Sequence, residues 1–311
     1  MKNKSKIMKH KVFESSDSNV MKFVFEDEAE IGRKAIAVEA VLYKYPTYGE
    51  RTVICCSVQS GCPVGCNFCG TGMFFQRNLS SEEIVEQVET VLQYTDCNLS
   101  DIKKFQIMFM SMGEPFMNYE NTEKAIRILN KLYPNAALLV STSAPGNRFR
   151  EKFDQFIDLS REIENVGLQF SLHESNDDAR GKLIPTPTIC VAGIASYGHL
   201  WAMKTGRKPF FNYCVHAGNS SQSNVNELKD LFNPSVWEVT LSVICEKNQS
   251  MKSAIEQQMD IIGKFQQKMM DAGYSLRVFN PAGQDDIGGG CGQLWYFQEW
   301  LEKQKNQINH E

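Results

Sequence analysis

Long apolar runs are missing from this sequence of 311 residues. No stretch comes near the roughly 18 uninterrupted apolar residues that a membrane-spanning helix needs, which excludes an integral helical membrane protein. The first residues, MKNKSKIMKHKVFESSDS, are basic but contain no apolar segment of the kind that secretory signals carry. We therefore expect a cytoplasmic protein without a membrane partner, whose start is a frayed or partner-binding tail.

An excess of positive charge is also missing. The formal net charge is −4, whereas a nucleic-acid-binding protein usually carries a basic patch. The charge balance therefore argues mildly against a nucleic acid partner, although the lysines at positions 2, 4, 6, 9 and 11 form one local cluster. Internal repeats, low-complexity tracts and linker-like segments are absent too, which favours one large catalytic domain.

Cysteine, in contrast, is plentiful. The chain has 10 cysteines, and half of them, at positions 55, 56, 62, 66 and 69, lie in one short segment. A secreted disulfide framework would be spread more evenly and would follow a signal peptide. Thiols gathered in a cytoplasmic protein instead indicate metal ligands or redox groups.

Short apolar segments alternate with amphipathic helical segments from about residue 52 onward. Most of the apolar segments are hydrophobic on both faces, as parallel strands covered on two sides are. Ser80-x-x-Glu83 has the pattern of a capping box at the start of one helix. We expect strands at 52–57, 105–110, 136–141, 166–172, 209–215 and 238–244, a helix over about 251–272 and a last strand near 276–279.

Six β/α units in series predict a parallel sheet that curves into a barrel. Because a closed barrel of this type has eight strands, we expect an α/β fold with a partial (β/α)6 barrel. We divide the chain into an N-terminal β extension (1–50), the barrel with a C-terminal catalytic loop (51–296) and a C-terminal tail (297–311). Catalytic residues should lie just beyond the carboxyl ends of the strands, where such folds place their chemistry.

A glycine-rich segment, GCPVGCNFCGTG at 61–72, directly follows the first predicted strand. Cys62, Cys66 and Cys69 in it have the spacing C-x3-C-x2-C, and the glycines let the backbone wrap closely around a bulky ligand. Three thiolates bind three irons of a 4Fe–4S cubane, and the fourth iron has no protein ligand. Catalytic metal sites likewise keep one coordination position free for a substrate. That open iron can bind the amino and carboxylate groups of S-adenosylmethionine. The alternative is a structural zinc site with one distant further ligand, although zinc ligands usually come as paired C-x2-C or Cys/His units.

Polar residues also follow the next three predicted strands. Gly113 leaves room after the second strand, and Glu114 offers a carboxylate to the ammonium group of methionine. Hydroxyls suited to a carboxylate or a ribose follow the third strand, and a Ser-Leu-His motif follows the fourth. Each motif alone is common in turns and helix caps, but together they predict one cofactor site at one end of the barrel. Its residues are Gly113, Glu114, Ser141, Ser171, Leu172 and His173.

The cysteine spacing resembles the signature of the radical S-adenosylmethionine superfamily. Within it, five segments resemble the RlmN/Cfr family, whose members methylate adenine carbons in RNA. The resemblance extends over about residues 37–296 in matching order and is densest around the cluster cysteines and around Cys291. The five segments are 62–79, 112–115, 141–143, 171–173 and 286–294.

The resemblance implies a radical methyltransferase that modifies an adenine carbon, carbon 2, in ribosomal or transfer RNA. One S-adenosylmethionine methylates Cys291, and a second, cleaved at the 4Fe–4S cluster, yields the radical that takes a hydrogen from this methyl group. The carbon radical adds to adenine, Glu39 accepts a proton, and Cys55 releases the product and forms a disulfide with Cys291. The resemblance further implies an electron donor such as flavodoxin. It also suggests Asn248 as the counterpart of a family asparagine that contacts S-adenosylmethionine.

Three alternatives remain at this point, and one is a non-enzymatic RNA-binding module stapled by zinc. The chain could be another radical S-adenosylmethionine enzyme, acting on a peptide or a small molecule, in which Cys55 and Cys291 have no catalytic role. Cys291 could also be an ordinary loop residue, but the glycines on both sides favour a mobile segment that carries a thiol between two positions. Of the adjacent Cys55 and Cys56, only one should reach the site, because a strand turns neighbouring side chains to opposite faces.

Overall fold

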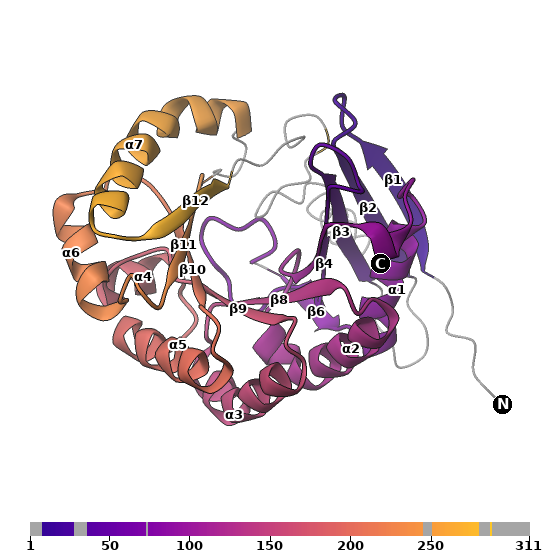
Figure 1. Cartoon of the computed structure of the whole chain (residues 1–311), viewed down its shortest axis with the longest axis horizontal. Helices are drawn as coiled ribbons and strands as arrows, with labels where there is room; N and C mark the ends of the chain where they lie inside the picture. The colour runs from indigo at the N-terminus through magenta and orange to yellow at the C-terminus, as the bar shows by residue number, and fades with distance from the viewer. Residues whose placement is uncertain (1–7, 28–35, 73, 245–250, 280–286, 288–311) are drawn as a thin grey trace, which may run out of the picture.

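The computed structural model describes residues 8–27, 36–72, 74–244, 251–279 and 287 (Figure 1). A curved ten-stranded sheet, in the order β1-β2-β3-β4-β7-β8-β9-β10-β11-β12, forms the centre of this part, and β5-β6 form a separate small sheet. The strands are β1 (Lys9–Glu14), β2 (Val20–Asp27), β3 (Ile36–Lys44), β4 (Arg51–Cys56), β5 (Gln59–Gly61), β6 (Phe75–Asn78), β7 (Lys104–Phe109), β8 (Ala136–Thr142), β9 (Val166–Ser171), β10 (Phe210–Cys214), β11 (Glu238–Ser242) and β12 (Ser275–Phe279). The helices are α1 (Ser81–Leu92), α2 (Tyr119–Leu132), α3 (Gly146–Glu162), α4 (Asp177–Leu183), α5 (Val191–Thr205), α6 (Gln222–Leu231) and α7 (Met251–Asp271), with short 3-10 turns η1 (Leu99–Asp101) and η2 (Pro115–Asn118).

The predicted partial barrel is confirmed. From β4 to β12 all neighbouring strands of the large sheet are parallel, and they coincide with the predicted strands to within a few residues. At least one helix follows each of the first six of these strands, and β12 ends the series, as Figure 1 shows.

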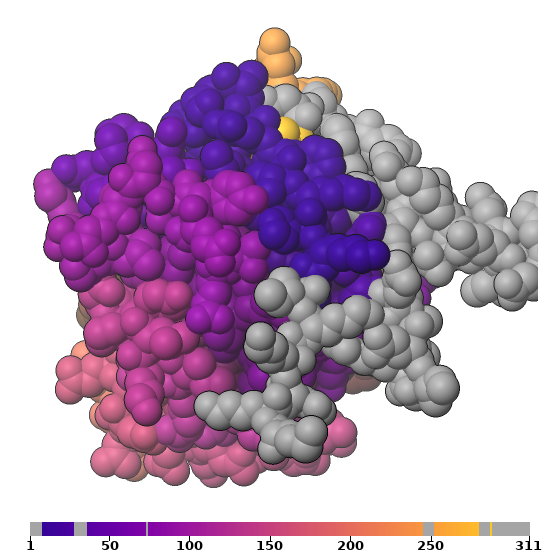
Figure 2. Space-filling model, turned by 90° about the vertical axis from the view of Figure 1, so that its right-hand side faces the viewer, coloured from indigo at the N-terminus to yellow at the C-terminus, as the bar shows by residue number. Residues whose placement is uncertain are grey.

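The N-terminal strands continue the same sheet. β1, β2 and β3 pair antiparallel with one another, and β3 pairs antiparallel with β4. In Figure 2 the indigo residues of this hairpin region form one continuous surface with the magenta residues of the first β/α units. The sheet therefore carries residues of β2 and β3 directly to the side of the barrel's first strand.

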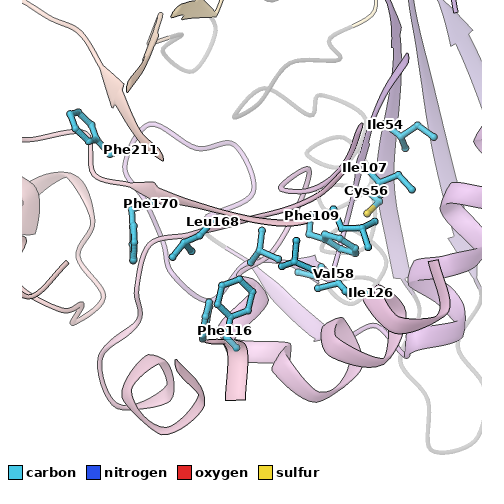
Figure 3. Packing of buried hydrophobic residues seen from close by; sticks show 14 of the residues in the cluster. Ile54, Cys56, Val58, Ile107, Phe109, Phe116, Ile126, Leu168, Phe170 and Phe211 are labelled. Atoms are coloured by element: carbon cyan, nitrogen blue, oxygen red, sulfur yellow. The ribbon is translucent and has the colours of Figure 1, made fainter. Parts of the chain in front are cut away.

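The helices cover the outer face of the sheet. The predicted capping box at the start of α1 is confirmed: the Glu83 amide donates to Ser80 Oγ (3.2 Å), and the Ser80 amide donates to Glu83 Oε2 (2.8 Å). Outward side chains of neighbouring strands, among them Ile107 and Phe170, pack with helix residues such as Ile126 into the main core (Figure 3). No helix in the described ranges is long and apolar enough to span a membrane.

The two faces of β4 separate its two cysteines, as the alternation of side chains along a strand requires. Cys56 points outward into the main core, and its thiol lies 3.6 Å from the carbonyl oxygen of Met108. Cys55 points to the inner face, where it joins a second apolar cluster that contains Val41 and Val53. The expectation that only one of the pair reaches the barrel interior is confirmed.

Candidate functional site

The cysteine loop is closed at its base by the β5-β6 hairpin. Gly61 pairs with Phe75, and the Cys62 amide donates to the carbonyl oxygens of Phe74 (2.7 Å) and Thr71 (3.2 Å). Gly61 has a φ of +75°, and a Cβ atom there would lie 1.8 Å from the Phe74 oxygen, so only glycine fits. Sequence reasoning missed this hairpin because its strands are only three and four residues long and carry no apolar alternation.

Backbone hydrogen bonds inside the loop set the spacing of the cysteines. The Cys69 amide donates to the Cys66 oxygen (3.0 Å), and the Gly72 amide donates to the Cys69 oxygen (3.2 Å). The loop is also tied to residues that follow α4, since Thr186 Oγ1 donates to the Val64 oxygen (2.6 Å). The path of the loop backbone is therefore fixed by hydrogen bonds to its own carbonyl groups, and the Cys69 thiol also contacts Thr71 Oγ1 at 3.1 Å.

The three loop thiols lie close enough to influence one another's charge. Burial raises the pKa of Cys62 to about 12, and repulsion from Cys69 and Glu114 adds to this, while amides of Val64 and Gly113 hydrogen-bond to the thiolate and oppose it. Burial also raises the pKa of Cys66, and the neighbouring thiolates Cys69 and Cys62 raise it further. Binding of metal must therefore displace protons from these thiols.

The donor set fits an iron–sulfur cluster. Within the described ranges, no three His, Cys, Asp or Glu side chains converge closely enough to ligate a single metal ion. A cubane does not require such convergence, because its three cysteines bind three different irons. Cys62, Cys66 and Cys69, gathered in one loop with mutual electrostatic influence, have the chemistry and the arrangement that such a cluster needs.

Glu114 is buried beside this loop and joins two strands. Its carboxylate accepts hydrogen bonds from Thr142 Oγ1 (2.7 Å), the Ser143 amide and hydroxyl (both 2.8 Å) and the Phe116 amide (3.0 Å). Burial raises the pKa of Glu114, and these hydrogen bonds oppose that shift. The donors occupy the roughly four acceptor positions of a carboxylate, so Glu114 ties the end of β7 to the end of β8.

Gly113, the residue before it, has a φ of +96°. A Cβ atom there would lie 2.7 Å from the side chain of Gln59, so the tight approach of this loop to β5 needs glycine.

The predicted serines come together on the inner face of the barrel. Ser141 Oγ lies 3.4 Å from Ser171 Oγ on the neighbouring strand, and Gln169 Nε2 donates to Ser141 Oγ at 3.2 Å. Ser242 Oγ donates to Asn212 Oδ1 at 2.7 Å two strands further on. Gln169, Asn212 and Ser242 were not predicted, although each occupies an inward position of its strand.

The Ser-Leu-His motif contributes to the site through different groups. The Leu172 side chain packs in the core, so only its backbone is available at the strand end. His173 has a φ of +63°, and its ring packs edge-on against Phe68 of the cysteine loop, 5.2 Å between centroids. Burial lowers the pKa of His173 to about 3, so the imidazole is neutral. Its Nδ1 is buried without a hydrogen-bond partner in the described residues, as expected for a group that faces an absent polar ligand.

Arg180 of α4 is a site residue that the sequence did not reveal. Its guanidinium, 2 % exposed, donates to the carbonyl oxygens of Ser143 (2.8 Å), Ser171 (3.2 Å) and Leu172 (3.1 Å). It also contacts the Thr188 hydroxyl and the Ile189 oxygen. Burial lowers the pKa of Arg180 to about 10, which leaves it charged at neutral pH, within electrostatic reach of Cys66 and Glu114.

Replacing Arg180 with methionine is expected to lower the free energy of unfolding by roughly 3–5 kcal/mol, because several buried carbonyl groups lose their donor at once. Urea unfolding of the purified protein measures this. Arg161→Met is the control, since Arg161 is exposed and forms a solvent-exposed ion pair with Asp158 at 3.8 Å; it should cost no more than about 1 kcal/mol. A loss below about 1 kcal/mol for Arg180→Met would contradict the role of this residue as the tie between β8 and β9.

Glu39 and Cys55 lie on the same inner face. Cys55 is the register partner of Val41, and Glu39 is two residues before Val41 on β3, so its side chain projects to the same side. Glu39 is completely buried, and Lys22 Nζ lies 3.4 Å from its Oε2. The sheet register therefore places Glu39 and Cys55 on the same face of two adjacent strands.

Ile287, a residue beyond β12, lies at the same place. Ile287 is partly buried and packs into the inner-face cluster that includes Cys55. The predicted residues Asn248 and Cys291 lie outside the described residues.

Comparisons with known proteins identify the family. Residues 56–192 match the Radical SAM superfamily. The chain is 30% identical to "Dual-specificity RNA methyltransferase RlmN" of Wolinella succinogenes, over 98% of this chain and 88% of that protein, and 33% identical to a probable enzyme of the same name from Koribacter versatilis, over 80% and 70%. Among solved structures, a radical SAM methyltransferase from Sphaerobacter thermophilus is similar, with a TM-score of 0.72, 28% identity and coverage of 92% of this chain and 81% of that one.

Proposed function

The chain belongs to the RlmN family of radical S-adenosylmethionine methyltransferases, and from this premise we propose that it methylates carbon 2 of an adenine in ribosomal or transfer RNA through a methylated cysteine. The names of its relatives, dual-specificity RNA methyltransferases, support RNA as the substrate. The family also implies an iron–sulfur cluster and S-adenosylmethionine, which the residues described above fit.

One observation carries the cysteine part of this proposal. Ile287 packs in the same inner-face cluster as Cys55. Cys291 follows four residues later, and four residues of fully extended chain span at most about 14 Å. The peptide chain therefore allows the Cys291 thiol to reach the Cys55 thiol, which the disulfide-forming step requires.

In this proposal Cys62, Cys66 and Cys69 hold the cluster. Gly113, Glu114, Ser141, Ser171, Leu172, His173 and Asn248 form the S-adenosylmethionine site, where the hydroxyls and the neutral His173 offer hydrogen bonds and Glu114 fixes the shape of the strand ends. Once bound and reduced by a donor such as flavodoxin, the cluster would supply the electron for reductive cleavage of S-adenosylmethionine and would accept one electron when the adduct becomes aromatic again.

Cys291 solves the chemical difficulty of the target. An aromatic adenine carbon has no lone pair, so it cannot displace a methyl group from S-adenosylmethionine directly. A thiolate can, and the methylated Cys291 then loses one hydrogen atom to become a carbon radical that adds to adenine. The result is a covalent bridge between protein and RNA.

Glu39 and Cys55 resolve that bridge. The Glu39 carboxylate takes the proton of the adenine carbon, and the electron pair of the broken C–H bond stays in the ring. The Cys55 thiolate attacks the sulfur of Cys291, the carbon–sulfur bond breaks, and the released carbon takes a proton to become the methyl group. A disulfide between Cys55 and Cys291 remains and must be reduced before the next turnover.

Nucleoside mass spectrometry tests the substrate and the position. RNA from cells with and without the gene is digested, and the nucleosides are compared with synthetic 2-methyladenosine and 8-methyladenosine. The proposal expects 2-methyladenosine only in RNA from cells that have the gene. Identical nucleosides in both samples, together with S-adenosylmethionine cleavage by the purified enzyme, would instead favour a peptide or small-molecule substrate.

A further inference from the structure

Lys22 is a lysine whose side chain is buried in an apolar strand. It lies in β2 between apolar residues, only 3 % of it is exposed, and lysine is rarely buried unless it is paired. Its Nζ is 3.4 Å from Glu39 Oε2 and 5.3 Å from the centre of the Phe13 ring. The ammonium group is thus held between a carboxylate and an aromatic face inside the protein.

The sheet register places this pair at the proposed reaction centre. Lys22 and Cys55 are both register partners of Val41, so the three residues form one row across β2, β3 and β4. Glu39 is the next residue of β3 that faces the same side. Lys22 on β2 therefore lies beside Val41 on β3, which pairs with Cys55 on β4. Lys22 is also in direct ionic contact with Glu39.

We propose that Lys22 is a positioning residue that keeps Glu39 ionised and directs its carboxylate, so that Glu39 can accept the proton from the adenine carbon. This inference rests on the proposed function. A buried carboxyl group without a neighbouring cation favours its neutral form, and a neutral carboxylic acid cannot accept a proton. In the proposed step the C–H proton moves to the Glu39 carboxylate, and Lys22 itself exchanges no proton.

The charged or titratable groups near Glu39 differ from element to element among the described residues. β4 contributes Cys55 on this face, and β1 contributes Lys11, which is exposed and lies 3.8 Å from Glu26 of β2. The three residues of β5 carry no charge, and α1 packs against the opposite face of β3. Lys22 is accordingly the buried cation in contact with Glu39 among the described residues.

The test uses three variants of the full-length, cluster-loaded enzyme. Lys22→Met removes the charge, Lys22→Gln removes the charge but keeps a hydrogen-bond donor, and Lys22→Arg keeps the charge. Lys11→Met, one strand further out and exposed, is the matched control. Each variant is assayed for methyl-Cys291, for S-adenosylmethionine cleavage, for covalent protein–RNA adduct and for RNA methylation across a range of pH.

We expect Lys22→Met and Lys22→Gln to form methyl-Cys291 and to cleave S-adenosylmethionine as the wild type does, yet to accumulate adduct near neutral pH. Their methylation should then rise by roughly tenfold per pH unit until Glu39 ionises, because the fraction of carboxylate limits the step. Lys22→Arg and Lys11→Met should keep the wild-type pH profile. If Lys22→Met does not fold, the pH profile of Lys22→Gln is compared with that of the wild type instead.

The proposal is overturned if both uncharged variants keep the wild-type pH profile, or if Lys22→Arg is as impaired as they are. Failure of the proposed function is a different result, because it would leave the wild-type enzyme itself without methyl-Cys291 or without adduct.

Discussion

Cys66→Ala is expected to prevent assembly of the iron–sulfur cluster and to abolish RNA methylation. Two thiolates cannot hold a cluster that needs three, and without the cluster no radical forms. The fold should survive, because the loop is built by backbone hydrogen bonds, such as that from the Cys69 amide to the Cys66 oxygen (3.0 Å), which alanine keeps. Iron and sulfide analysis of the purified protein, with its absorption spectrum, measures the loss.

The control for this prediction is Cys97→Ala. Cys97 is a free, half-buried thiol outside the cysteine loop, and its removal should leave iron content and methylation at the wild-type level. Wild-type iron and sulfide in Cys66→Ala would contradict the assignment of the cluster. Zinc as the main metal in the wild-type protein would contradict it as well and would restore the structural zinc site.

Cys55→Ala is expected to stop the reaction after the covalent bridge has formed. The variant should form methyl-Cys291 and cleave S-adenosylmethionine, but without the attacking thiolate it should retain the RNA. Each enzyme molecule would then complete no turnover, and a protein–RNA adduct stable to denaturation should appear on a gel. Nuclease digestion followed by peptide mass spectrometry should locate the attachment at Cys291.

The adjacent cysteine provides the control. Cys56 points into the main core, and burial raises its pKa, so its thiol stays protonated and is a poor nucleophile. Cys56→Ala should lose stability through a small cavity but turn over without adduct. Adduct in Cys56→Ala, or normal turnover in Cys55→Ala, would show that the roles of the two thiols had been assigned wrongly.

Local patterns in the sequence were sufficient for the barrel and for the cysteine loop. The strands β4, β7, β8, β9, β10 and β11 are largely apolar segments of parallel sheet, and the capping box at Ser80 depends on residues three apart. The alternation that separates Cys55 from Cys56 is likewise a local property of an extended strand. These predictions succeeded because the physical cause lies within a few residues of the feature.

The contacts that complete the site could not be predicted in this way. Arg180 is one of several basic residues in a polar segment, and its partners, the carbonyls at the ends of β8 and β9, become neighbours only when the barrel forms. Three of the four donors to Glu114 likewise belong to Thr142 and Ser143, at the end of another strand. Lys22 alone gave a local signal, since a lysine interrupts the apolar run of β2, but its partner Glu39 is on another strand.

Isotope labelling tests the central claim, transfer of the methyl carbon through Cys291, most directly. The enzyme turns over RNA with S-adenosylmethionine whose methyl group carries three deuterium atoms, and the products are analysed by mass spectrometry. Because the radical removes one hydrogen from the methylated cysteine, the new methyl group on adenine should retain two deuterium atoms, and 5′-deoxyadenosine should gain one. A methyl group that arrives with all three deuterium atoms, or methylation that persists in Cys291→Ala, would contradict the account.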